Sequence, residues 1–185
     1  MDGLVNRHHR ACDRFGAVAK AFPSEQWAAP TPCTEWTAHA LVEHVIGFHE
    51  FLLLRPLNVR VHRPRKGRYE RWNTTAAALF DCLDAEGVLD CATDLPGGGQ
   101  SSARLMLAAL TTDVLVHTWD LARAGGIEPD LDSELTAAAY DSAMSTGLRR
   151  DDGMIGPEII GDFASDIESR MVAFYSRDPA WQPPA

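Results

Sequence analysis

The chain has 185 residues, a mass of 20.3 kDa and apolar side chains at 45% of its positions. This content is enough to bury a hydrophobic core and excludes wholesale disorder, and the length predicts one domain over residues 1–185. No apolar stretch approaches the roughly 20 residues that a membrane-spanning helix needs. Residues 1–10 also lack the apolar segment of a secretory signal, so we expect a cytosolic protein without membrane contacts.

The overall charge is negative, because 17 Lys and Arg residues face 26 Asp and Glu residues and give a formal net charge of −9. This balance argues against nucleic-acid binding by the whole surface. The segment from Arg55 to Arg71 is the exception, because its only acidic residue is Glu70. It is interpreted either as a solvated loop with scattered arginines or as a local anion site.

The four cysteines show neither a CxxC pair nor zinc-knuckle spacing; they are Cys12, Cys33, Cys82 and Cys91. In a cytosolic protein they are expected to be free thiols. Cys12 and Cys82 fall within helical patterns, where a free cysteine usually acts as a small buried hydrophobe.

Helical periodicity runs through nearly the whole chain. Pro23 ends the first helix, Thr37 is a plausible N-cap of the second, and Gly125 with Gly126 stops the fourth. The predicted helices cover, in chain order, residues 2–22, 37–54, 68–86, 102–124, 133–147 and 164–176. Loops are expected at 27–36, 56–67 and 89–100. This order predicts an all-α fold, an up-and-down four-helix bundle with additional C-terminal helices.

Polar side chains interrupt the apolar faces of two of these helices. His44 shares a face of the second helix with Leu41 and Val45, and Asp113 and His117 lie one turn apart on the fourth helix. An ionised aspartate on a core face is costly unless another group pairs with it.

A divalent metal would satisfy His44, Asp113 and His117 together, and bundles commonly hold metals between facing helices. A catalytic metal takes three protein ligands and keeps one open position. Two nitrogens and one carboxylate suit Zn, Ni or Fe(II). The alternative is that Asp113 pairs with His117 or with an arginine, and that no metal is bound.

The other histidines are weaker candidates. His8 falls on the apolar face of the first helix, as a core residue or as a residue lining the site. We interpret the remaining four as non-ligands: His9, His39, His49 and His62.

Three segments carry a resemblance to a known family: residues 27–47, with Thr31-Pro32-Cys33-Thr34-Glu35-Trp36-Thr37 and Leu41-Val42-Glu43-His44; residues 113–124, from Asp113 to Ala124; and the ending Phe174 to Trp181. They resemble the metal-binding domain of the mycothiol-dependent maleylpyruvate isomerases, in the DinB-like (YfiT-like) superfamily, and its short stand-alone members.

The resemblance implies a DinB-like four-helix bundle that holds a divalent metal. It places the family's two histidine ligands at His44 and His117 and its carboxylate ligand at Asp113, where the isomerases typically carry Glu. The isomerases have a further C-terminal domain that a chain of this length is too short to contain, which argues against maleylpyruvate isomerisation itself.

What the resemblance implies about activity is a transferase or isomerase that uses a low-molecular-weight thiol, mycothiol, on a small electrophilic substrate. The metal, with Zn ahead of Ni or Fe, would favour the thiolate, which then attacks the electrophile. Asp120 either orients His117 or makes a helix-end hydrogen bond. Arginines of the 55–71 segment could hold a carboxylate, whereas Trp36 and Trp119 are expected to pack.

Two other functions stay open. One is a metal-binding module without turnover, such as a sensor or a stress-response protein. The other is anion or nucleic-acid contact through Arg60 to Arg71, which the acidic balance disfavours. The sequence leaves the oligomeric state open, with a homodimer as one option.

Overall fold

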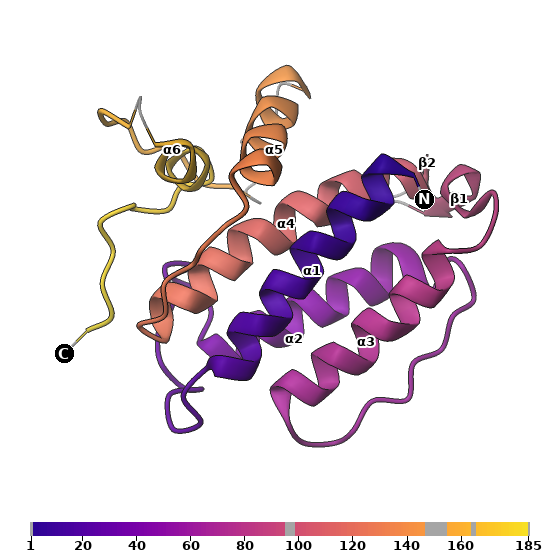
Figure 1. The fold of residues 1–185 in the computed structure, drawn as a ribbon, viewed down its shortest axis with the longest axis horizontal. Helices are drawn as coiled ribbons and strands as arrows, with labels where there is room; N and C mark the ends of the chain where they lie inside the picture. Colours follow the sequence, from indigo (N-terminus) through magenta and orange to yellow (C-terminus); the bar gives the residue numbers. More distant parts are fainter. Residues whose placement is uncertain (1, 95–98, 147–154, 164–165, 185) are drawn as a thin grey trace.

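The computed structural model describes residues 2–94, 99–146, 155–163 and 166–184. Four long helices form a bundle (Figure 1): α1 (Gly3–Ala21), α2 (Ala38–His49), α3 (Arg68–Leu83) and α4 (Ala103–Ala124). A π-helical turn, η1 (Glu50–Leu54), extends α2 without a break. The all-α prediction is confirmed, and the bundle helices begin and end within about three residues of their expected positions.

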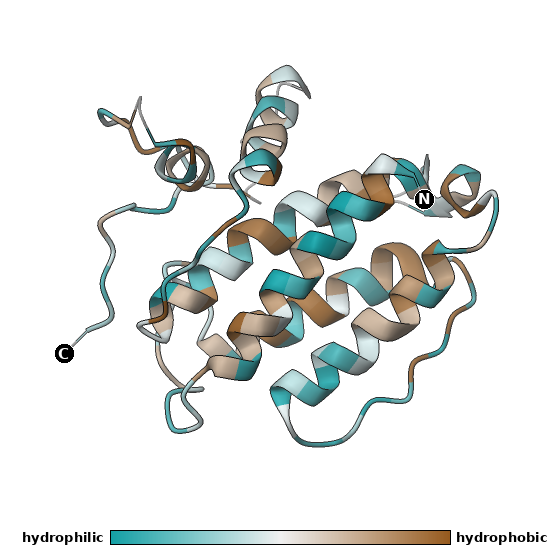
Figure 2. Cartoon of the chain, in the orientation of Figure 1, coloured by the Kyte–Doolittle hydropathy of each residue, from teal (hydrophilic) through white to brown (hydrophobic). Residues whose placement is uncertain are grey.

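Local chemistry explains where these helices begin. Asp2, Thr37 and Ser102 each accept a hydrogen bond from a backbone N–H in the first turn of α1, α2 and α4, as N-cap residues do. Helix α4 lies at the centre of the fold, and most of its residues from Val114 to Ala124 are buried. Figure 2 shows hydrophilic and hydrophobic residues alternating around the outer helices, which is the pattern of amphipathic helices around one core.

The bundle is not up-and-down, so this part of the sequence-based prediction is wrong. Helices α2 and α3 run in the same direction, and both run opposite to α1 and α4 (Figure 1). The side chains agree, because Arg71 in the first turn of α3 binds Glu43 near the start of α2. Helices α1 and α4 likewise end side by side, because Phe22, directly after α1, packs against Gly125, directly after α4.

A long connection over residues 55–67 makes this topology feasible. Helix α3 has 16 residues and is about 24 Å long, a distance that a dozen extended residues cover easily. The connection is tied to η1 and α3 through arginine. Arg63 donates to Glu50 at 2.5 Å and to Thr75 at 2.8 Å, and Arg55 donates to Glu50 at 3.0 Å. Several cations of the basic segment therefore fasten the crossover to the bundle.

The expected loop at 89–100 contains regular structure that the sequence analysis missed. A short 3-10 turn, η2 (Val88–Asp90), precedes β1 (Ala92–Asp94), which pairs antiparallel with β2 (Gln100–Ser102). Each strand has only three residues, too short for an alternating pattern to stand out. The Pro96-Gly97-Gly98 turn of the predicted loop lies outside the described residues.

The C-terminal part packs on the α4 side of the bundle. Helix α5 (Ser133–Thr146) packs on α6 (Ile167–Phe174), and the chain then runs along α4. Arg123 of α4 donates to the backbone carbonyl of Trp181 at 2.7 Å. Residues 147 and 164–165, the outer ends of the two predicted C-terminal helices, lie outside the described part. Among the described residues no helix is both long and apolar enough to cross a membrane.

The close approach of α1 and α4 gives a stability prediction. A Cβ added at Gly125 would lie 2.8 Å from two ring carbons of Phe22, whereas one added at Gly47 meets nothing within 4 Å. Gly125→Ala should therefore lower the free energy of unfolding by about 1–3 kcal/mol through overpacking. Gly47→Ala in α2 should raise it by about 0.5–1 kcal/mol through helix propensity. Urea denaturation of both variants measures the two effects, and equal effects would contradict the close packing.

Candidate metal centre

His44, Asp113 and His117 converge between α2 and α4. Asp113 Oδ1 lies 3.6 Å from His44 Nε2 and 3.5 Å from His117 Nε2, and the two imidazole centroids are 5.0 Å apart. The three donor atoms all lie within 4.8 Å of one another. The sequence analysis named these three residues as one group, and the fold brings them together.

The spacing of these atoms indicates what the group can bind. Separations of 3.5 and 3.6 Å are too long for good hydrogen bonds. They are close to the roughly 3.3 Å between neighbouring ligands of a tetrahedral zinc ion, given zinc–nitrogen and zinc–oxygen bonds of about 2.0–2.1 Å. Asp113 Oδ2 is buried and has no hydrogen-bond partner. An orphaned carboxylate oxygen beside two imidazoles fits a cation.

A buried carboxylate behind the site fixes His117. Asp120 is fully buried, and its Oδ2 accepts a hydrogen bond from His117 Nδ1 at 2.9 Å. This bond places the proton of a neutral imidazole on Nδ1, so that Nε2 offers its lone pair to the centre. The orienting role considered for Asp120 in the sequence thus has the geometry it needs.

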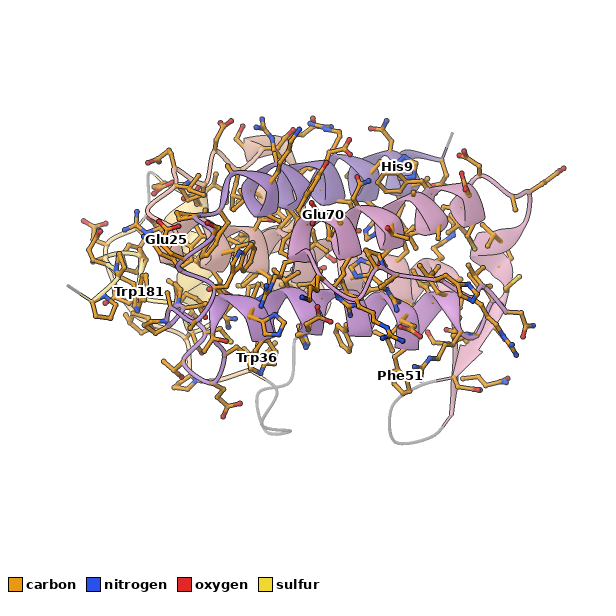
Figure 3. The ribbon with its side chains drawn as sticks, turned by 90° about the horizontal axis from the view of Figure 1, so that it is seen from below. His9, Glu25, Trp36, Phe51, Glu70 and Trp181 are labelled. Carbon is orange, nitrogen blue, oxygen red and sulfur yellow. The ribbon has the colours of Figure 1, made fainter. Side chains whose placement is uncertain are left out.

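Aromatic side chains enclose the His44 side of the centre. The indole of Trp36 stacks on the His44 ring at a centroid distance of 4.0 Å, and Phe48 lies 5.1 Å from the same ring. Figure 3 shows Trp36 beside α2, at the margin of the bundle. The His44 side chain keeps 24% of its surface exposed and that of Asp113 keeps 18%, whereas His117 keeps 6%. Solvent therefore reaches the centre from the His44 side.

The comparisons place the chain in a family. The family described as the mycothiol maleylpyruvate isomerase N-terminal domain matches residues 8–122, a range that contains all three donors. The chain belongs to this family. Two uncharacterized proteins of Mycobacterium tuberculosis, from strain CDC 1551 / Oshkosh and strain ATCC 25618 / H37Rv, are each 33% identical over 163 residues, covering 87% of this chain and 84% of theirs. No solved structure matches the chain significantly.

Arg177 is the site residue that the sequence analysis did not single out, and it lies outside the range matched by the isomerase family. Its guanidinium donates to Asp120 Oδ2 at 2.9 Å from Nη2 and to Oδ1 at 3.2 Å from Nε. The chain has 15 arginines, and only the need of a buried Asp120 for a counter-charge could have pointed to one of them.

The other predicted residues take up different places. His8 and His49 are buried together elsewhere in the core, with ring centroids 5.2 Å apart. His39 accepts a hydrogen bond from Arg68 at the surface, and His9 packs on Phe80. Trp119 is buried in the core, as expected for a packing residue, whereas Trp36 covers His44.

Charge decides the protonation of the metal-free centre. Burial alone would lower the pKa of His117, but the nearby charge of Asp113 and the hydrogen bond to Asp120 raise it to about 9. Burial likewise opposes ionisation of Asp113, but the charge of His117 holds the pKa of that carboxyl well below its ordinary value. Without a cation, the centre is a carboxylate beside a protonated His117.

This protonation gives a pH prediction for the metal-free protein. The pKa of His117 rises from 6.5 in the unfolded chain to about 9 in the fold, so its contribution to stability is complete below pH 6.5 and is lost as the pH rises through 9. The melting temperature of chelator-treated protein should fall across this window. His117→Phe should reduce this fall in melting temperature, whereas His62→Gln, in the exposed connection, should leave it unchanged. An unchanged slope in His117→Phe would show that another group titrates.

The buried pair behind the centre gives a second prediction. Arg177→Met leaves the Asp120 carboxylate without its main counter-charge, so the free energy of unfolding should fall by roughly 3 kcal/mol. Arg170→Met on α6 removes only a cation–π contact with Tyr140 and should cost less than about 1 kcal/mol. Adding Asp120→Asn to Arg177→Met should recover part of the loss. Denaturant titration of the original chain, Asp120→Asn, Arg177→Met and the double variant measures the coupling, and additive losses would exclude it.

Proposed function

We propose that the chain holds one divalent cation, Zn in the first place and Ni or Fe as alternatives, through His44, Asp113 and His117. The observation that carries the proposal is the Asp113 carboxylate, which has one oxygen at ligand spacing from two imidazole nitrogens and the other without a partner. Two nitrogens and one oxygen leave a tetrahedral ion one position for a further ligand. Membership of the isomerase family supports this assignment.

We infer that the further ligand is a low-molecular-weight thiol, and the family points to mycothiol. A divalent cation held here would favour the thiolate form of such a thiol at neutral pH. Cys33 is a cysteine of the chain near this centre, and in the metal-free protein burial raises the pKa of its thiol to about 11, although the charge of Arg177 opposes this shift. We assign the reacting sulfur to an external thiol on the strength of the family.

The thiolate supports two reactions on a small electrophile. Its sulfur forms a bond to an electrophilic carbon, and a proton from solvent on the neighbouring carbon completes a conjugate, which is a transfer. When the added sulfur leaves again after rotation about the former double bond, the thiolate is regenerated and the product is a cis–trans isomer. The chain's own residues position the donors: Asp120 holds His117, and Trp36 stacks on the His44 ring.

A second candidate function is a metal-binding module without turnover. The stacking of Trp36 on His44 favours it, because the indole covers part of the side from which a substrate would approach. Such a module would bind the cation in the same way and would gain stability from it, but would consume no thiol.

One set of variants tests the proposal and separates the two functions. Protein purified without a metal-affinity step should contain one divalent cation by elemental analysis, and a chelator should lower its melting temperature. Asp113→Asn keeps the shape of the side chain and should lose the cation, whereas His62→Gln should keep it. A protein without stoichiometric cation, or an Asp113→Asn variant that keeps it, would falsify the metal assignment.

The proposed thiol-dependent activity is tested with mycothiol and a panel of electrophiles. The metal-loaded chain should consume the thiol faster than the buffer alone, and Asp113→Asn should reduce the rate to that of the buffer. A metal-loaded protein that is strongly stabilised by its cation but inactive across the panel supports the module instead.

A further inference from the structure

A second cluster of donor atoms lies in the core between α1 and α2. His8 and Cys12 lie one turn apart on α1, and His49 is the last residue of α2. Their exposed fractions are 0%, 1% and 0%. One nitrogen of each histidine and the sulfur of Cys12 lie within 4.8 Å of one another.

Hydrogen bonds fix the tautomers of both histidines. The Thr111 hydroxyl donates to the Leu107 carbonyl at 2.7 Å, so at 2.9 Å it accepts from Nδ1–H of His8. His49 Nδ1–H donates to the Val45 carbonyl at 2.7 Å. Both rings therefore keep a lone pair on Nε2. Histidine ligands of metals are usually held in this way, with one nitrogen donating to the protein and the other free for the ion.

The protein alone does not satisfy this cluster. Cys12 Sγ lies 3.3 Å from His8 Nε2, but His49 Nε2 is buried and has no hydrogen-bond partner. A buried polar atom without a partner is uncommon and costly, and it calls for an explanation such as a bound ion. The cluster places a donor nitrogen of His49 within 4.8 Å of the Cys12 sulfur and of a His8 nitrogen.

We propose that His8 Nε2, Cys12 Sγ and His49 Nε2 bind one Cu(I) ion in a three-coordinate site, separate from the proposed divalent centre. Thiolate and imidazole donors suit Cu(I), which is a soft ion. The thiol proton of Cys12 passes to solvent when the copper–sulfur bond forms, and copper stays in the +1 state. The ion and the thiolate then cancel each other in charge.

Charge and coordination number favour Cu(I) over Zn(II). Zinc with one thiolate and two neutral imidazoles would leave a net positive charge beside Phe15 and Trp72, which is costly in an apolar core. Zinc also takes four ligands, and in the described part of the chain no other His, Cys, Asp or Glu joins the cluster. Three donors and overall neutrality match a monovalent ion.

The surroundings offer an entry path and a local reason for the geometry. A cavity of about 280 Å³ between α1 and α3 is lined by Cys12, Gly16, Trp72 and Phe80 and opens to solvent. The π-helical turn η1 begins directly after His49, and such turns are frequent at functional sites.

An anaerobic competition experiment tests the site. Cu(I), supplied as its acetonitrile complex with bicinchoninate as competitor, should be withdrawn by one equivalent of metal-free protein. Cys12→Ala should weaken binding by roughly 100-fold or more, since removal of a ligand costs at least as much as removal of its supporting hydrogen bond. His49→Gln should also weaken it. Cys82→Ala, a half-buried cysteine on α3, should bind as the original chain does.

Two further measurements make the result decisive. X-ray absorption at the copper edge should show two nitrogen donors and one sulfur donor. Asp113→Asn should bind Cu(I) unchanged, which separates this site from the divalent centre. The proposal is overturned if the folded chain withdraws no Cu(I), if Cys12→Ala and Cys82→Ala bind equally, or if these ligands hold Zn(II) that Cu(I) does not displace.

Discussion

The arrangement of the proposed metal centre depends on the buried carboxylate of Asp120. This carboxylate accepts from His117 on one side and from Arg177 on the other, and it is fully buried. Through Arg177 the C-terminal segment is held to α4, and through His117 the same carboxylate sets the lone pair that faces Asp113. A residue near the end of the chain thereby supports a ligand on the central helix.

The same constraint explains the charge of the centre. Arg177 balances Asp120, so the charge of Asp113 is left for another cation to balance. In the metal-free protein a proton on His117 supplies that charge, which is why the pKa of His117 rises to about 9. A divalent ion bound at Nε2 has to displace this proton, and binding should therefore strengthen as the pH rises.

Local features of the fold could be predicted from the sequence, whereas long-range ones could not. Periodicity and capping residues placed the helices, and the spacing of Asp113 and His117 identified the centre, because both are properties of single helices. The direction of α3 depends on the path of the 55–67 connection, which periodicity does not encode. His49 was interpreted as a non-ligand because it lies off the His44 face, but α2 packs against both α3 and α4 and so buries more than one face.

The two groups of donor atoms that include an α2 histidine differ in charge and in chemical softness. His44 faces a carboxylate on α4, and a negatively charged hard donor stabilises a divalent ion even near solvent. His49, five residues later, lies in the core near the Cys12 thiol and the His8 imidazole, and the site that we propose there would favour a soft ion of low charge. Because α2 continues into a π-helical turn directly after His49, the backbone there departs from the regular helical spacing that an ordinary helix would impose. A single helix thus presents two imidazoles to two chemically different environments, and in our proposals the donors of the partner helix, α4 or α1, set which ion each would hold.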